Sequence, residues 1–299
     1  MKTIDAEYIK TVLKPRSRDA HKGDFGKVLI YAGSTGMAGA AVLCGKAALK
    51  SGAGLVRFLL PSFDAPIYPI LQTAVPEATC VAFDEDPDLG EYSCIICGPG
   101  LGDRDESSYI FQYILSHYSG VALLDADALN MLSNHTELTE YFKDSGATFI
   151  LTPHIGEARR LLKNPAAKAV CYDKEDLVAM AEGPIKSEEE RELALKMLSD
   201  CYNSLVVLKG AGTLCGTDID MCMNTTGNPG MATGGSGDVL SGIIGGLAAQ
   251  GLCPKDAANA GAYIHGLAGD LAAEALTEIS LTAGDIVSYI PAAFKTVLS

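Results

Sequence analysis

Short apolar runs without polar alternation recur along the chain, and they constrain its fold more than any other feature. Strands with no polar face are typical of a sheet that is covered by helices on both sides. The sequence therefore predicts an α/β fold, a three-layer sandwich with a mostly parallel central sheet and right-handed crossovers. The runs cover residues 27–31, 55–60, 94–97, 121–124, 149–151 and 204–208.

Helical patterns separate several of these runs, at residues 39–50, 107–116, 156–162 and 187–200. After residue 209 the pattern changes. A short hairpin is predicted at 213–215 and 221–224, followed by helices near 237–250, 255–276 and 283–297. The charged stretch 163–186 contains prolines and is interpreted as a candidate mobile excursion. Without an internal repeat or a low-complexity linker, we expect residues 1–299 to form a single domain.

The net charge and the cysteines indicate which partners the protein can have and which cell compartment suits it. The formal net charge of −14 repels phosphate backbones, so we expect no nucleic-acid partner, and a phosphorylated ligand must be held by local donors. Signal-peptide and membrane-spanning patterns are absent from the sequence, so we expect no membrane partner. Nine scattered cysteines suit a reducing cytoplasm. Cys94 and Cys97 lie in one apolar run, where residues three apart point to opposite faces, so packing is the preferred interpretation.

The strongest chemical signal is the glycine-rich stretch 224–242, in which residues 233–237 precede a helical run that opens at Asp238. Glycines let neighbouring N–H groups converge, and a helix N-terminus adds unpaired donors and partial positive charge. This pattern predicts an anion hole for a phosphoryl group, with Asp238 beside it as a base. The alternative is that Asp238 only stabilises the helix N-terminus. The chain has no Walker A motif.

Other polar segments directly follow predicted strands, where open α/β sheets bind ligands. Lys209 to Thr213 could meet a nucleotide, or could form an ordinary turn with an exposed lysine. His154 could contact a phosphate or a substrate. Glu157 could hold a metal-bound water, although a glutamate in the first turn of a helix is expected anyway. Each segment alone is a weak signal, and their shared position at strand ends is what favours a site.

These segments together resemble the NAD(P)H-hydrate dehydratase family, whose members have a ribokinase-like fold. The resemblance runs through nearly the whole chain, and its last segment is the most specific. The segments are H-K-G-D-F-G-K-V-L-I at 21–30, G-A-A-V-L-C-G-K-A-A-L-K-S-G-A-G-L-V at 39–56, G-P-G-L-G at 98–102, D-A-D-A-L-N at 125–130, L-T-P-H-I-G-E at 151–157, K-G-A-G-T at 209–213 and G-N-P-G-M-A-T-G-G-S-G-D-V-L-S-G at 227–242.

The resemblance implies a defined reaction. Reduced nicotinamide cofactors slowly gain water across a ring double bond, and the family phosphorylates the resulting hydroxyl of the S epimer (NADHX or NADPHX) with ADP or ATP. Phosphate then leaves and the double bond returns, which restores NADH or NADPH. Such phosphoryl transfer needs alignment and charge stabilisation more than covalent help from the protein. The family also implies Mg²⁺ and a tendency to form homo-oligomers.

The resemblance also implies roles for individual residues. The catalytic residues are Asp238 as the base and Gly235, Ser236 and Gly237 as the anion hole. The nucleotide-binding residues are Lys209, Gly210, Ala211, Gly212, Thr213 and Gly237. The hydrate-binding residues are Ala40, Gly102, His154 and Asp238. Asn130, Glu157 and Asn228 help to hold phosphates and magnesium, Glu157 through a water.

The chain departs from the family pattern at Ile155, where relatives commonly have proline, and this should change the local turn more than the chemistry. Many relatives carry an N-terminal epimerase domain. Because the dehydratase segments begin near His21, we expect no such domain here and a separate chain for any epimerase. The competing hypotheses are a ribokinase-like kinase of a small alcohol, such as a thiazole or hydroxymethylpyrimidine vitamin precursor, and a non-catalytic nucleotide-binding regulator.

Overall fold

The computed structural model describes residues 1–61, 66–83, 87–168 and 170–299, and its strands form one ten-stranded sheet. The strand order across the sheet is β1-β10-β9-β8-β7-β6-β5-β2-β3-β4. The strands are β1 (Lys2–Ile4), β2 (Lys27–Tyr31), β3 (Leu55–Leu60), β4 (Thr79–Ala82), β5 (Cys94–Cys97), β6 (Val121–Leu124), β7 (Thr148–Leu151), β8 (Leu205–Leu208), β9 (Leu214–Gly216) and β10 (Met221–Asn224).

All neighbouring strands run parallel except β9, which is antiparallel to both β8 and β10. The register aligns the carboxyl ends of the central strands, because Tyr31 pairs with Cys97, Cys97 with Leu124, and Leu124 with Leu151. The segments that follow these strands therefore leave the sheet along one edge. The predicted parallel sheet and the hairpin after residue 209 are both confirmed.

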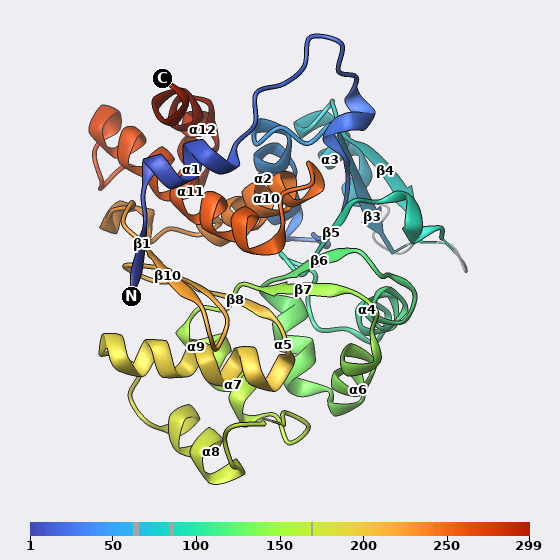
Figure 1. Cartoon of the computed structure of the whole chain (residues 1–299). Helices are drawn as coiled ribbons and strands as arrows, with labels where there is room; N and C mark the ends of the chain where they lie inside the picture. Colours follow the sequence, from blue (N-terminus) through green and yellow to red (C-terminus); the bar gives the residue numbers. More distant parts are fainter. Residues whose placement is uncertain (62–65, 84–86, 169) are drawn as a thin grey trace.

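Two helical layers cover the sheet, so the predicted three-layer sandwich is confirmed (Figure 1). One layer packs on the face that Val28 and Ile30 enter, the other on the face of Leu29 and Tyr31. The first layer contains α1 (Ala6–Val12), α2 (Ala38–Lys50), α3 (Tyr68–Ala74), α10 (Ser236–Ala249), α11 (Pro254–Leu276) and α12 (Ala283–Leu298). The second contains α4 (Asp105–His117), α5 (Asp127–Asn134), α6 (Thr136–Asp144), α7 (Ile155–Lys163), α8 (Lys174–Glu182) and α9 (Glu188–Tyr202).

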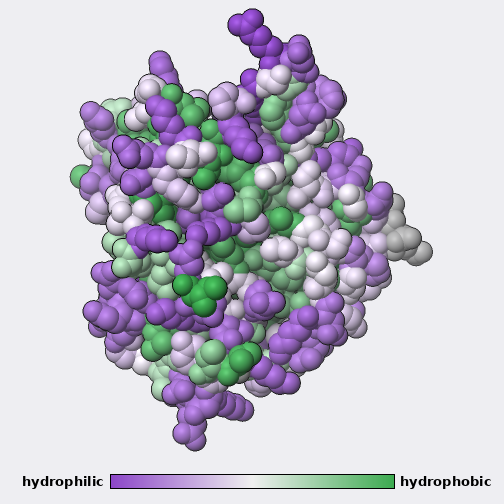
Figure 2. All heavy atoms as spheres, in the orientation of Figure 1, coloured by the Kyte–Doolittle hydropathy of each residue, from purple (hydrophilic) through white to green (hydrophobic). Residues whose placement is uncertain are grey.

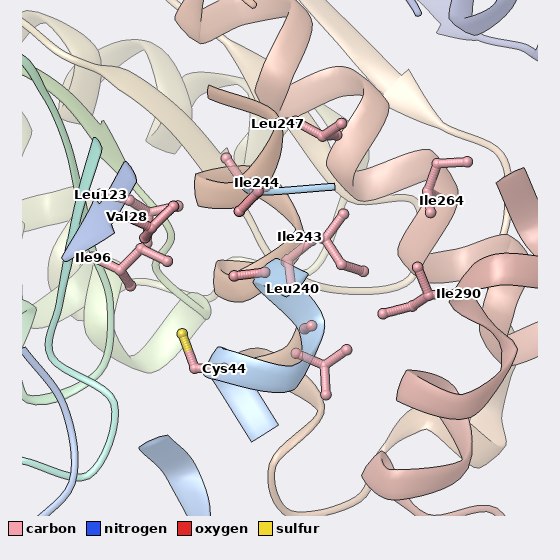
Figure 3. Close-up of a cluster of buried hydrophobic side chains, with 14 of the residues drawn as sticks. Val28, Cys44, Ile96, Leu123, Leu240, Ile243, Ile244, Leu247, Ile264 and Ile290 are labelled. Atoms are coloured by element: carbon pink, nitrogen blue, oxygen red, sulfur yellow. The ribbon is translucent and has the colours of Figure 1, made fainter. Parts of the chain in front are cut away.

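The core of the first layer is built around α10. Figure 3 shows Ile243 and Ile244 of this helix between the sheet, represented by Val28 and Ile96, and the side chain of Ile264 on α11. Helix α2 approaches α10 so closely that a Cβ on Gly242 would lie 2.2 Å from the Cys44 carbonyl oxygen. Only glycine fits at this contact. The close packing fixes where the N-terminal end of α10 lies relative to the sheet.

The two cysteines of β5 behave as predicted. Cys94 packs in the core of the first layer and Cys97 in the core of the second, and both are fully buried. Burial raises the pKa of the Cys94 thiol to about 12, which leaves it protonated at neutral pH. The structure therefore gives these side chains a packing role.

Several elements were not predicted from the sequence, namely β1, β4, α1, α3, α5, α6 and α8. Strands β1 and β4 are short and lie at the two edges of the sheet, where only one side of the backbone is paired. Helix α8 lies inside the stretch 163–186, where no regular element was predicted. Its Leu177 and Ala181 are buried in the second layer. Residue 169 of that stretch lies outside the described residues.

Among the described residues, none of the helices combines the length and the apolar character needed to cross a bilayer. Figure 2 shows a largely hydrophilic face in which pale and green residues gather across the middle, at the level of the sheet in Figure 1.

Candidate functional site

The segments that follow β6, β7 and β8 converge, as the positions of the predicted site residues suggested. Asp125 comes directly after β6, and Lys209 directly after β8. The Lys209 N–H donates to the carbonyl of Pro153, 2.8 Å away, and His154 and Lys209 form an isolated parallel bridge. The sheet pairing thus continues beyond its last regular residues and places these side chains together.

A cavity of about 850 Å³ opens beside this convergence. This volume is in the range of pockets that hold a ligand of nucleotide size. Its wall includes every residue of the predicted nucleotide segment and two residues of the predicted anion hole, together with His154 and Asn228. The predicted site residues that line it are His154, Lys209, Gly210, Ala211, Gly212, Thr213, Asn228, Ser236 and Gly237.

The N-terminus of α10 forms one side of this cavity. The helix begins at Ser236, slightly earlier than predicted, because Gly235 adopts a left-handed conformation with φ 90°. A Cβ there would lie 2.4 Å from Leu43 Cδ1, so the turn requires glycine. The first N–H groups of a helix have no partner within it. The chain therefore presents donors and the positive end of the helix dipole toward a ligand in the cavity.

Asp238 lies in the first turn of α10 and is half-buried. Burial, followed by the negative charge of Asp125, raises the pKa of Asp238 to about 7, while Lys209 opposes the shift. A carboxylate that served only to stabilise a helix N-terminus would have a lowered pKa. The structure thus gives Asp238 the pKa of a general base that works near neutral pH.

Lys209 reaches from β8 into a group of carboxylates. Its ammonium nitrogen lies 2.6 Å from Asp125 Oδ1 and 3.8 Å from Glu157 Oε2, and its side chain is 18% exposed. Burial alone acts to lower the pKa of Lys209, but the charges of Asp125 and Glu157 overcome this and raise it. The Lys209 ammonium is therefore charged at neutral pH.

Asp125, the carboxylate nearest to Lys209 in this group, is 1% exposed. Its second oxygen accepts a hydrogen bond from the Ser241 hydroxyl on α10 at 2.7 Å. Its first oxygen also accepts from the Ala126 N–H at 2.9 Å. Sequence reasoning placed Asp125 in a segment at a strand end but gave it no role. Neither Lys209 nor Ser241 could be recognised as its partner from sequence spacing.

His154 and Glu157 close the start of α7. The Glu157 carboxylate accepts from the His154 N–H at 2.8 Å, while His154 Nδ1 accepts from the N–H groups of Gly156 and Glu157. This is the helix-start arrangement that was the alternative interpretation of the segment. Burial raises the pKa of Glu157 and lowers that of His154. His154 nevertheless also lines the cavity.

The other two predicted hydrate contacts, Ala40 and Gly102, are not among the residues that line the cavity. Both are partly exposed and lie near Met37, and the surface they share is called the second surface below. Met37 lies close to Gly102 and also to Gly100, and Gly100 is in turn next to Ala40. The Gly102 N–H donates to Asp127 at 2.8 Å, and Asp127 raises the pKa of Asp238. Asp238 is thus within the electrostatic reach of both surfaces.

Asn130, a predicted phosphate or magnesium residue, belongs to this second surface. Its amide donates to Asp127 at 3.2 Å and its carbonyl oxygen accepts from Arg160 at 2.8 Å. Asn228, by contrast, lines the cavity and donates to Asp270 at 2.9 Å. The structure therefore does not bring Asn130 and Asn228 to one place.

His265 is a cavity residue that the sequence analysis missed. It lies on α11, lines the cavity, and its Nε2 is 3.3 Å from the Ser236 hydroxyl. Burial lowers its pKa to about 4, so the ring is neutral at physiological pH. A single histidine in a long apolar helix resembles a core residue, and no sequence signal separates the two cases.

No three His, Cys, Asp or Glu side chains converge into a metal site in the parts of the chain that the structure describes. Glu157 is 5% exposed and is engaged by His154 and Lys209. Within the described residues there is thus no cage of three or more such side chains for a divalent cation. Magnesium commonly keeps several waters and binds substrate phosphates with one or two carboxylates.

Comparison with known proteins gives a consistent result. A family model described as NAD(P)H-hydrate dehydratase matches residues 28–292. The bifunctional NAD(P)H-hydrate repair enzyme Nnr of Moorella thermoacetica is 37% identical, and the alignment covers 96% of this chain and 53% of that protein. The chain spans about half the length of such bifunctional relatives. The ADP-dependent (S)-NAD(P)H-hydrate dehydratase of Neisseria meningitidis is 36% identical, with 92% of this chain and 87% of that protein covered.

Solved structures agree with these sequences. The ADP/ATP-dependent NAD(P)H-hydrate dehydratase from Bacillus subtilis, crystallised with ATP and Mg²⁺, superposes with a TM-score of 0.78 at 26% identity. The superposition covers 99% of this chain and 98% of that one. Structural neighbours of this kind include a ribokinase-like superfamily protein, so the predicted ribokinase-like fold is confirmed.

Proposed function

This chain belongs to the NAD(P)H-hydrate dehydratase family, and from that premise we propose that it restores NADH or NADPH from the hydrated S epimers NADHX and NADPHX. The proposed phosphoryl donor is ADP or ATP. The observation that carries the proposal is the position of Asp238, a half-buried carboxylate with a pKa of about 7 in the first turn of α10. A base in that place can serve a hydroxyl that attacks a phosphoryl group at the helix N-terminus.

The proposed reaction begins with the nucleotide in the cavity. Its terminal phosphoryl group faces Gly235, Ser236 and Gly237, and the helix N-terminus compensates the charge that develops during transfer. Asp238 accepts the proton of the hydrate hydroxyl as its oxygen attacks phosphorus. The bond to the nucleotide breaks, and AMP or ADP leaves. Phosphate then departs from the ring with loss of a proton from the neighbouring carbon, which restores the double bond.

The arrangement of the two surfaces supports this assignment of ligands. The nucleotide segment from Lys209 to Thr213 lines the cavity. Ala40 and Gly102 lie on the second surface, where Gly102 contacts Asp127, and would hold the hydrate. Asp238 responds to charges on both sides, since Asp127 raises its pKa and Lys209 lowers it. A base between two ligands is what transfer from one to the other requires.

Mg²⁺ is proposed as a companion of the nucleotide phosphates, where it would neutralise phosphate charge. We expect Glu157 to act on it through a water, since Mg²⁺ at substrate phosphates needs only one or two carboxylates from the protein. We also propose, as expectations from the family, that the chain is a cytoplasmic homo-oligomer with one dehydratase domain, and that an epimerase acts in the same process.

The test is a turnover assay with the purified protein, Mg²⁺ and NADHX, with ADP and ATP in parallel. Return of reduced-nicotinamide absorbance supports the proposal and identifies the donor. A variant with Asp238→Asn is the matched control. If folded protein binds nucleotide but no absorbance returns, the dehydratase proposal is wrong. A stable phosphorylated alcohol, formed from a thiazole or hydroxymethylpyrimidine substrate, would instead establish a small-alcohol kinase.

A further inference from the structure

The side chain of Asp125 joins three elements that each contribute to the candidate site. One oxygen lies 2.6 Å from the Lys209 ammonium at the end of β8, and the other accepts from Ser241 on α10. Ser241 is three residues after Asp238 and so lies on the same side of the helix. A single buried carboxylate therefore fixes both the lysine and the helix that carries the base.

This contact directs Lys209 toward the start of α10. A Cβ built on Gly237 would lie 3.3 Å from the Lys209 ammonium and 3.8 Å from Asp125 Oδ2. Gly237 belongs to the predicted anion hole. The lysine charge thus lies beside the place where a phosphoryl group would sit, and not at the far end of the cavity.

The residue that follows Asp125 has an unusual backbone conformation. Ala126 has φ 46° and ψ −114°, a region that residues other than glycine rarely adopt. The neighbouring Gly98, with φ 128°, allows close approach, because a Cβ there would lie 1.8 Å from the Asp125 carbonyl oxygen. Strain of this kind persists where the surrounding structure enforces it, and it concentrates at functional sites.

We propose that Asp125 is a positioning residue for phosphoryl transfer, which holds the Lys209 ammonium against the N-terminus of α10 so that the lysine faces the transferred phosphoryl group. The inference rests on the proposed function and extends it, because no role for Asp125 follows from the nucleotide or hydrate contacts. Lys209 then stabilises the charge of the transfer step, and Asp125 acts through it.

The charges around Asp238 make the proposal testable by pH. The charged groups that act on the pKa of Asp238 are Asp125 beyond β6, Asp127 on α5 and Lys209 beyond β8. Burial, followed by the charge of Asp238, raises the pKa of the Cys44 thiol on α2, which stays uncharged. Asp125 raises the pKa of Asp238 and Lys209 lowers it. Removal of Asp125 should therefore move the acidic limb of the rate profile to lower pH, and removal of Lys209 should move it to higher pH. A general loss of structure would not produce opposite shifts.

The experiment compares the wild type with Asp125→Asn, Lys209→Met and the double variant. For Asp125→Asn we expect kcat to fall about tenfold or more without a rise in the nucleotide KM, because loss of a carboxylate does not weaken anion binding by charge. In the Lys209→Met background, Asp125→Asn should cost little more, since the effect passes through the lysine. The double variant has neither buried charge, so it should fold even if a single variant, with one unpaired buried charge, does not.

Asp220→Asn is the control for the chemical change itself, because Asp220 pairs with Lys255 on the surface. It should leave kcat and the pH profile unchanged. An Asp125→Asn variant with unchanged kcat, with an unshifted acidic limb, or with an effect that adds fully to that of Lys209→Met would overturn the inference. An inactive wild type that still binds nucleotide would instead contradict the proposed function itself, and the inference with it.

Discussion

The ammonium of Lys209 lies 2.6 Å from a carboxylate oxygen of Asp125, although the two residues are 84 positions apart in the chain. The contact is possible because β6 and β8 flank β7 and end at the same edge of the sheet. The mostly buried pair sits beside the cavity wall, with Glu157 as a third member. Lys209 is thereby placed to stabilise this buried group and, in the proposed function, to act on the transferred phosphoryl group.

Replacement of Lys209 by alanine should weaken nucleotide binding, with KM for the donor rising about tenfold or more, because a charge next to the phosphates is lost. The variant should also unfold more easily, by about 3–5 kcal/mol, since Asp125 is left buried without its partner. Titration with ADP and thermal unfolding measure the two effects separately. Lys255→Ala, at an exposed ion pair, is the control and should change neither. An unchanged nucleotide KM would contradict the assignment of Lys209.

Asp238→Asn should fold normally, bind nucleotide as the wild type does, and lose about 10²–10⁴-fold in turnover, the usual contribution of a general base. Nucleotide affinity from calorimetry and kcat from the absorbance assay decide this. We further expect Asp285→Asn, at the start of α12, to leave turnover unchanged, because that carboxylate only caps its helix. Near-full activity of Asp238→Asn would leave the helix-start interpretation as the correct one.

The pKa of about 7 at Asp238 predicts a pH-dependent rate. The base must be ionised, so kcat should fall as the pH drops below about 7. The effect on stability has the opposite sign. A carboxyl whose pKa is raised by folding contributes stability that is fully present below its unfolded pKa and is lost as the pH rises through about 7. Above that pH, Asp238→Asn should therefore be more stable than the wild type, by up to roughly 4 kcal/mol. Chemical denaturation at pH 4 and pH 8 provides the comparison, and an equal difference at both values would refute it.

Ala126→Gly should raise the free energy of unfolding by about 1 kcal/mol, because glycine adopts a positive φ without the strain that alanine has there. The hydrogen bond that the residue 126 N–H donates to the Asp125 carboxylate involves no side-chain atom of residue 126 and is retained. Gly98→Ala is the opposite change, since its Cβ would collide with the Asp125 carbonyl, and it should destabilise the protein strongly. Thermal unfolding of both variants tests the pair of predictions, and a less stable Ala126→Gly variant would show that residue 126 is not strained.

The sequence was sufficient for the central sheet and for the glycine loop, because both depend on local patterns. Unbroken apolar runs predict buried strands, and glycines before a helical run predict an anion-binding turn. The residues that contact the predicted site residues could not be predicted from the sequence. Asp125, Ser241 and His265 acquire their roles from contacts between distant elements, and nothing in their sequence neighbourhood distinguishes them from core or helix-start residues. The edge strand β1 was not predicted for a related reason, since its strand partner is the distant β10, where Lys2 pairs with Cys222.

Helix α10 has a further consequence for how the molecule forms. The helix lies against the sheet and α2, with residues 239–249 all buried, yet it follows every strand in the chain. During synthesis, the apolar surface of the sheet and of α2 that α10 covers therefore stays exposed until α10 has been made. Such surface favours association between incomplete chains. Because the helix also carries the proposed base and anion hole, only a chain in which α10 has docked could be active, and activity would then report that folding is complete.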